Sequence, residues 1–122
     1  AKQAVLVEQN RKAVDCINRN LEFTKLKDKA RVITGDCVAA IDSLERSGLV
    51  FDIIFMDPPY GKLLEKQVLN RLASSGIVDK NTWIIVESDL DTEYDYLTDI
   101  GYEIDRVKKY KTNKHTFIQE IL

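Results

Sequence analysis

Short apolar runs alternate with segments of helical periodicity along most of this 122-residue chain. The runs are rich in β-branched and aromatic residues, which is typical of buried strands, and the segments between them repeat apolar positions every three or four residues. The predicted strands cover residues 4–7, 30–34, 51–56 and 83–86. One predicted helix begins after Asn10, and three others cover approximately residues 37–46, 63–74 and 93–100. This alternation predicts an α/β domain with a mostly parallel, doubly wound, Rossmann-like sheet.

The last 21 residues follow a different pattern. Residues 102–111 form one run after Gly101 and residues 116–122 form another, and Thr112-Asn113-Lys114 between them has the composition of a turn. Two such runs joined by a short polar segment predict a β-hairpin. We therefore expect an antiparallel strand pair at the carboxyl end of the sheet.

The segment Asp57-Pro58-Pro59-Tyr60 directly follows the apolar run 51–56. Neither proline can donate to a sheet ladder, so the strand must stop at Asp57, at the edge where open α/β sheets bind ligands. The Asp57 carboxylate and the Pro58 carbonyl could accept both hydrogens of an amino group while Tyr60 stacks on the planar ring that carries it. This arrangement predicts catalysis of methyl transfer to an exocyclic amine. The alternative is a stiff turn with no chemistry.

Acidic residues follow two earlier strands. Glu8 ends the first apolar run, where a nucleotide-binding sheet places a carboxylate on ribose hydroxyls, and Asp36 ends the second. Asp36 is placed to accept from an adenine amino group, with the Cys37 backbone N–H beside it. The alternative for both acids is ordinary helix N-terminal chemistry, because unpaired N–H groups and the helix dipole favour carboxylates there.

Charge argues against indiscriminate binding to nucleic acid. The formal net charge is −2 and the isoelectric point is about 5.4, so any contact with phosphates must be local. Basic residues gather in one short stretch near the carboxyl end, and a further lysine follows the Asp57 segment. The candidate RNA contacts are Lys62, Arg106, Lys108, Lys109 and Lys111. The alternative for the terminal group is an edge strand that lysines protect from aggregation.

Few residues suit metals or disulfides. Cys16 and Cys37 show no Cys-x-x-Cys spacing, which indicates reduced thiols in a cytoplasmic protein. His115 is the only histidine and is predicted to lie on the surface, so we expect no metal site. No apolar run approaches the length of a membrane span, and we expect no membrane contact.

Taken together, these motifs resemble a known family. Glu8 in Val-Leu-Val-Glu, Asn20 in Ile-Asn-Arg-Asn-Leu, Gly35-Asp36 and the segment from Phe51 to Tyr60 are similar to the RsmD-type bacterial methyltransferases, which modify the exocyclic amino group of one guanine in small-subunit ribosomal RNA. The resemblance implies S-adenosylmethionine as methyl donor and a seven-stranded sheet. It also implies ribosomal RNA or an assembling small subunit as partner. We expect a monomer.

The chain departs from that family at its start. In a nucleotide-binding sheet the glycine-rich loop precedes the ribose-binding acid by about 20 residues, whereas only seven residues precede Glu8 and the first glycine is Gly35. We therefore expect residues 1–122 to be the carboxyl-terminal portion of one methyltransferase domain, without its first strand and glycine loop, and inactive alone. Two alternatives remain: the same chemistry on DNA adenine, transfer RNA or a protein glutamine, or a nucleotide-binding domain without catalysis.

Overall fold

A computed structural model describes residues 2–58 and 64–121 of the chain. Pro59, Tyr60 and Lys62, which the sequence places in the candidate site, lie outside the described residues. The chain forms two compact units, residues 1–43 and 44–122, and each is described by itself. The α/β class predicted from the sequence is confirmed.

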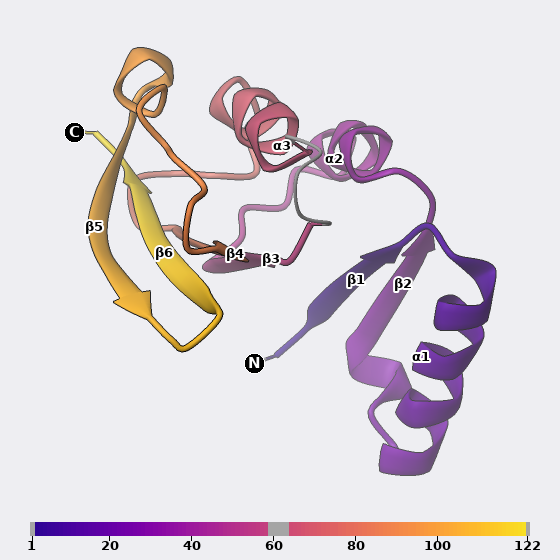
Figure 1. Ribbon diagram of the computed structural model, residues 1–122. Helices are drawn as coiled ribbons and strands as arrows, with labels where there is room; N and C mark the ends of the chain where they lie inside the picture. Colours follow the sequence, from indigo (N-terminus) through magenta and orange to yellow (C-terminus); the bar gives the residue numbers. More distant parts are fainter. Residues whose placement is uncertain (1, 59–63, 122) are drawn as a thin grey trace. The chain divides into compact units, whose positions relative to one another are not determined.

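The first unit is a parallel strand pair with one flanking helix. Strands β1 and β2 pair in parallel from Ala4 with Ala30 to Glu8 with Thr34, and α1 lies beside them (Figure 1). The carboxyl ends of both strands therefore meet at one edge. The elements are β1 (Ala4–Glu8), α1 (Arg11–Thr24), the 3-10 turn η1 (Lys27–Lys29), β2 (Ala30–Thr34) and the first turns of α2 (Cys37–Arg46).

Helix α1 begins where the sequence predicts. The Asn10 side chain accepts hydrogen bonds from the backbone N–H groups of Lys12 (2.9 Å) and Ala13 (3.3 Å). These bonds satisfy two of the N–H groups that a helix leaves unpaired at its start. The helix ends at Lys25, which has a left-handed φ of 60° and donates its N–H to the last turn.

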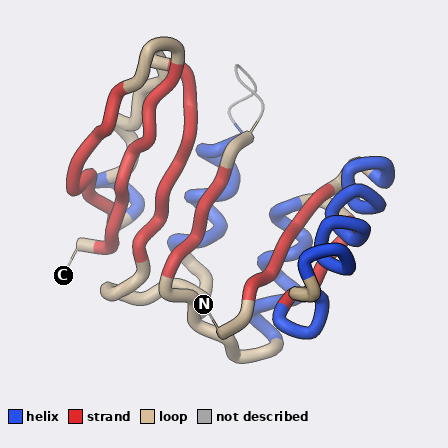
Figure 2. The backbone as a smooth tube through the Cα atoms, turned by 90° about the horizontal axis from the view of Figure 1, so that it is seen from below, coloured by secondary structure: helices blue, strands red, loops and turns tan. Residues whose placement is uncertain are grey.

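The second unit contains a four-stranded mixed sheet in the order β3-β4-β6-β5. Strands β3 and β4 are parallel, and β6 is antiparallel to both β4 and β5, which confirms the predicted terminal hairpin. Figure 2 shows these strands as a continuous layer. The elements are β3 (Ile53–Met56), α3 (Leu64–Ala73), β4 (Trp83–Asp89), the 3-10 turn η2 (Thr98–Ile100), β5 (Tyr102–Lys109) and β6 (Asn113–Glu120).

The core of this unit lies between one face of the sheet and α3 (Figure 1). Ile84 and Val86 of β4 and Ile118 of β6 are fully buried, as are Leu69 and Leu72 of α3. The strand residues that alternate with them point to the opposite face.

The opposite face of the sheet carries exposed apolar groups on β3. Ile53 is 63% exposed and Phe55 is 56% exposed. Within the described residues β3 pairs only with β4, so this strand presents both an apolar face and a free edge.

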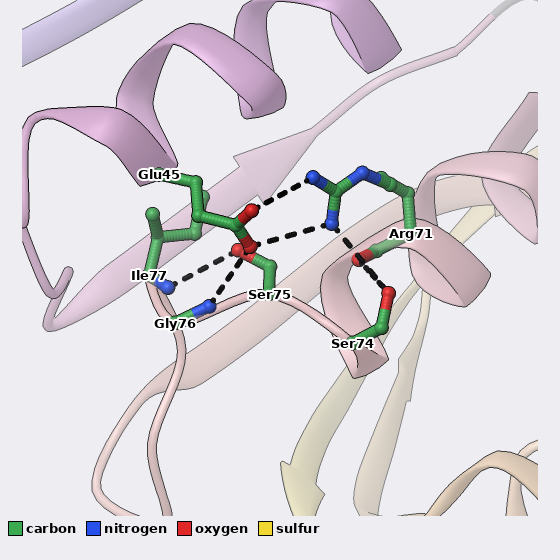
Figure 3. Close-up of polar contacts among 6 residues, drawn as sticks. All are labelled: Glu45, Arg71, Ser74, Ser75, Gly76 and Ile77. Carbon is green, nitrogen blue, oxygen red and sulfur yellow. Dashed lines mark hydrogen bonds and ion pairs between the residues drawn. The ribbon is translucent and has the colours of Figure 1, made fainter.

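An ion pair holds the end of α2 to the segment after α3. Arg71 donates to both carboxylate oxygens of Glu45, at 3.1 and 3.5 Å, and the Gly76 N–H donates to one of them at 3.3 Å. Figure 3 shows the guanidinium and the Gly76 backbone converging on the same carboxylate. The Glu45 carboxylate therefore connects the end of α2 to α3 and to the loop that follows α3.

Two expectations about the elements are wrong. The helix predicted over residues 93–100 is only the short 3-10 turn η2, because Tyr94 and Leu97 pack into the core and Tyr94 bonds Ser88 at 2.9 Å. Strand β4 continues to Asp89 instead of ending at 86, because β6 pairs with those extra residues. Glu87 therefore lies within the strand.

The pairing of β5 with β6 contains one irregularity. Ile104 pairs with Ile118, but Arg106 pairs with Phe117, so one extra residue is accommodated on β5 at Asp105. This is the arrangement of a β-bulge.

None of the helices in residues 2–58 and 64–121 has both the length and the apolar content needed to cross a bilayer.

Replacing Leu69 by alanine should destabilise the protein by about 2–5 kcal/mol, because it opens a cavity under fully buried strand residues. The free energy of unfolding from urea titration measures this. The exposed Lys80→Ala variant is the control and should change that free energy by no more than about 0.5 kcal/mol. Equal effects of the two substitutions would contradict the placement of the core.

Candidate active site

The first unit gathers three of the predicted site residues. Glu8 is the last residue of β1, Asp36 precedes α2, and Cys37 is its first residue. A backbone bond from the Gly35 N–H to the Glu8 carbonyl, at 2.9 Å, closes this edge. Gly35 has a φ of 150°, which side-chain-bearing residues rarely adopt.

Both carboxylates also bond to nearby backbone. Glu8 Oε1 accepts from the Asn10 N–H at 3.1 Å, and Asp36 Oδ2 accepts from the Ala39 N–H at 3.3 Å. The alternative interpretation, hydrogen bonding to helix N-termini, is therefore present in the structure. Both carboxylates can still accept further hydrogen bonds, because an ionised carboxylate has about four lone-pair sites.

The pKa of the Cys37 thiol reflects its proximity to the Asp36 and Glu8 carboxylates. Partial burial raises the pKa of the Cys37 thiol, and the negative charges of Asp36 and Glu8 raise it further. The acids thus form a negative edge that suits hydroxyl and amino hydrogens. The same edge disfavours a thiolate.

The second unit carries the start of the Asp57 segment. Asp57 follows β3 directly and is exposed, and Pro58 is partly buried. Met56 pairs with Val86, so Asp57 comes next to Glu87 of the neighbouring strand β4. Desolvation raises the pKa of Asp57, the charge of Glu87 and hydrogen bonding to its side chain raise it further, and His115 opposes the rise.

His115 is not the surface residue that the sequence suggests. Its side chain is 23% exposed, and its Nε2 lies 2.8 Å from Oε1 of Glu87. This hydrogen bond is the main reason why the pKa of Glu87 is lowered. The ring also makes edge contacts with Phe55 (5.8 Å between centroids) and Tyr110 (5.0 Å).

The terminal basic residues are exposed on β5 and the turn that follows. Arg106 and Lys108 pair with Phe117 and His115 of β6, so they share the face that carries the imidazole. The Arg106 guanidinium lies 4.4 Å from the centre of the Phe117 ring. Lys109 pairs with Lys114 and therefore points to the other face. Lys111 lies in the turn.

Sequence reasoning assigned no role to Glu87 or His115. An acid at the carboxyl end of the strand beside Asp57 is a signal that could have pointed to Glu87. His115 could not have been found without the register of β6, because antiparallel pairing can slide by two residues without changing faces.

No group of three or more His, Cys, Asp or Glu side chains in the described parts of the chain is arranged to hold a metal ion.

Solved structures with the same fold place the chain in a class. It matches the Escherichia coli protein titled "Putative methyltransferase yhhF" at 25% identity, with a TM-score of 0.76, over 98% of this chain and 63% of that one. It also matches SMU.776, titled "a putative methyltransferase complexed with SAH", with a TM-score of 0.71 over 98% of this chain and 39% of that one; at 15% identity this shows the fold alone. The chain has the methyltransferase fold.

The family follows from the sequence profile. Residues 1–119 match the profile of the family described as "Conserved hypothetical protein 95", and the chain belongs to that family. The Bacillus subtilis protein described as "Putative rRNA methyltransferase YlbH" is 25% identical over 92 residues, which are 75% of this chain and 50% of that protein. The chain therefore spans about half the length of this curated relative.

Cys37 should react slowly with iodoacetamide near pH 8, because its raised pKa leaves less thiolate. Asp36→Asn removes one of the charges that raise the pKa and should speed the reaction. Mass spectrometry of tryptic peptides follows both cysteines, with the exposed Cys16 as an internal control. Unchanged Cys37 kinetics in the variant would contradict the electrostatic effect of Asp36.

Proposed function

We propose that the protein carrying this chain transfers a methyl group from S-adenosylmethionine to the exocyclic amino group of a guanine in small-subunit ribosomal RNA. The observation that carries the proposal is the exposed Asp57 at the carboxyl end of a parallel strand, followed by Pro58 and next to Glu87 of the neighbouring strand. Membership of a family with a relative named for rRNA methylation supports the substrate class.

The edge formed by Glu8, Asp36 and Cys37 fits the nucleoside end of the donor. Its carboxylates can accept from two ribose hydroxyls and from the adenine amino group, and the Cys37 backbone N–H can donate to the ring. S-adenosylmethionine, when bound, supplies an electrophilic methyl group on a positively charged sulfur. The SAH complex of a protein with the same fold supports this choice of donor.

Asp57 and the residues after it would activate the amine. Its nitrogen is a weak nucleophile because the lone pair is delocalised into the base. Accepting both N–H hydrogens, with the Asp57 carboxylate and the Pro58 carbonyl, turns the lone pair toward the methyl group, while Tyr60 stacks on the base. The bound donor would supply the methyl group and keep the electron pair of the C–S bond on its sulfur, and Asp57 would take the proton that the nitrogen loses.

Reaching the base is energetically feasible. Unstacking a base costs a few kcal/mol. Stacking on an aromatic side chain returns about 1–3 kcal/mol, and a hydrogen bond to a charged acceptor contributes about 1.5–3 kcal/mol. These terms are comparable, so a site of this kind can hold an extruded guanine.

The basic residues are proposed to hold the RNA backbone. Arg106 and Lys108 lie on the sheet face that also carries His115, Glu87 and Asp57, so a strand bound there would pass close to the reacting base. Lys109, Lys111 and Lys62 would add contacts around it. We propose a monomeric cytoplasmic enzyme whose substrate is the assembling small subunit.

We also propose that the donor site is completed by residues of the full-length protein that this chain does not contain. The chain spans about half of the curated relative and 63% of the solved Escherichia coli structure. In the described residues β1 and β3 each pair on one side only, which leaves an edge available to a further strand. Activity is therefore expected of the full-length protein.

In the full-length protein, Asp57→Asn should lower kcat by about 10²-fold or more, because the amide cannot take the proton from the amine. The assay follows transfer of a labelled methyl group from S-adenosylmethionine to small subunits from cells that lack the gene. Nuclease digestion and mass spectrometry then identify the methylated nucleoside.

Asp52→Asn is the matched control, because Asp52 is an exposed aspartate at the other end of β3 and should leave kcat unchanged. Label in DNA adenine, transfer RNA or protein glutamine, with none in ribosomal RNA, would overturn the substrate. Absence of label in every acceptor would favour a nucleotide-binding domain without catalysis.

Arg106→Gln combined with Lys108→Gln should weaken RNA binding and flatten its dependence on salt. Each lost phosphate contact should reduce the slope of log K against log [salt] by about 0.7–0.9. Fluorescence anisotropy over a range of KCl concentrations measures the slope. Lys109→Gln, on the other face of the same strand, should have a smaller effect. An unchanged slope in the double variant would favour the protected-edge interpretation.

A further inference from the structure

Four charged or titratable side chains form a row across the sheet of the second unit. Glu87 of β4 pairs with His115 of β6, and His115 pairs with Lys108 of β5. Met56 pairs with Val86 on the other side, so Asp57 comes next to Glu87. The row runs from carboxyl to carboxyl to imidazole to ammonium, and its first member is the proposed catalytic acid.

The imidazole is held from several directions. Its Nε2 lies 2.8 Å from Glu87 Oε1, and the two side chains are 23% and 25% exposed. The ring planes of His115 and Phe55 stand at 83°, and those of His115 and Tyr110 at 65°. Because β3, β4 and the turn after β5 all contact this ring, its orientation is fixed, and it fixes Glu87 in turn.

Glu87 links this imidazole to Asp57. Two carboxyl groups can form a hydrogen bond only when they share a proton. The pKa of Glu87 is lowered, first by its bond to His115, while the pKa of Asp57 is raised by desolvation and by Glu87. A proton shared between the two groups therefore lies on Asp57 rather than on Glu87, and at pH values above its raised pKa Asp57 is a carboxylate that can accept a proton.

We propose that Glu87 and His115 are positioning residues for methyl transfer: His115 orients Glu87, and Glu87 orients the Asp57 carboxyl group and strengthens it as a proton acceptor. This inference rests on the proposed function. The proton released by the methylated nitrogen goes to the Asp57 carboxylate, where the adjacent negative charge of Glu87 stabilises it before it passes to water.

The charges around Asp57 act in opposite directions. Glu87 on β4 raises the pKa of Asp57, and His115 on β6 lowers it. Lys108 on β5 lies beyond His115 in the row, with its ammonium 5.6 Å from the centre of the Tyr110 ring. Removing the charge of Glu87 should therefore lower the pKa of Asp57, and removing His115 should raise it.

The test uses the full-length protein with aspartate labelled by ¹³C at the side-chain carboxyl. The variants are Glu87→Gln, His115→Gln and His115→Ala, with Glu103→Gln as control for loss of an exposed acid on the same sheet. The Asp57 resonance, identified by its loss in Asp57→Asn, is followed against pH. Its midpoint should move to lower pH in Glu87→Gln, to higher pH in both His115 variants, and not at all in the control. Far-ultraviolet circular dichroism verifies that each variant is folded.

Kinetics provide the second readout. Glu87→Gln should lower kcat roughly ten- to a hundredfold with little change in the KM for RNA, because a misplacement of about 1 Å at the reacting group can cost about 10²-fold. The acid limb of the pH profile should move in the same direction as the Asp57 midpoint. His115→Gln should retain more activity than His115→Ala, because an amide can still donate to Glu87.

The two proposals fail differently. If Asp57→Asn abolishes methylation but Glu87→Gln and His115→Ala have wild-type kcat, the positioning inference is overturned and the function stands. If no acceptor is methylated but the Asp57 midpoint moves as stated, the function is overturned and the coupling within the row is supported. Identical midpoints in all variants overturn the inference.

Discussion

Strand β4 is the element on which the second unit depends, because it pairs in parallel with β3 and antiparallel with β6. One face of β4 supplies fully buried core residues, and the other supplies Glu87. Since register fixes both faces at once, the packing that stabilises the unit also sets which side chains meet beside Asp57. A shift of one residue would bury the acid and expose the core. The pairing register of β4 therefore determines both the stability of the unit and the geometry of the site.

Local patterns predicted much of this fold. The Asn10 cap, the strand that stops before two prolines and the terminal hairpin each depend on neighbouring residues, and each is found. The failures are non-local. Residues 93–100 do not form a helix, because Tyr94 and Leu97 are drawn into a core that the sequence does not reveal, and β4 is extended by a partner strand about 30 residues away.

The same distinction applies to the candidate site. Glu8, Asp36 and Asp57 could be selected because each lies at or just after the carboxyl end of a strand, where such sheets bind ligands. The environment of these acids could not be predicted from the sequence. The proximity of Asp57 to Glu87, and the contacts that hold His115, arise only when three strands are aligned. Proton affinity is a property of that alignment, so a motif alone identifies a catalytic carboxylate without indicating how strongly it holds a proton.

The bulge at Asp105 has a consequence for how this protein can vary. Ile104 lies on the core side with Ile118, and in an unbroken ladder Arg106 would follow it there, opposite the buried Thr116. The extra residue reverses the alternation, so that Arg106 and Lys108 emerge on the side of Phe117 and His115. Straightening the strand without removing a residue would thus transfer these two cations to the other face of the sheet, whereas deletion of Asp105 would remove the bulge and leave both opposite Phe117 and His115. In this hairpin, the pairing register of the two strands determines on which face the charges lie, as much as the choice of amino acids does.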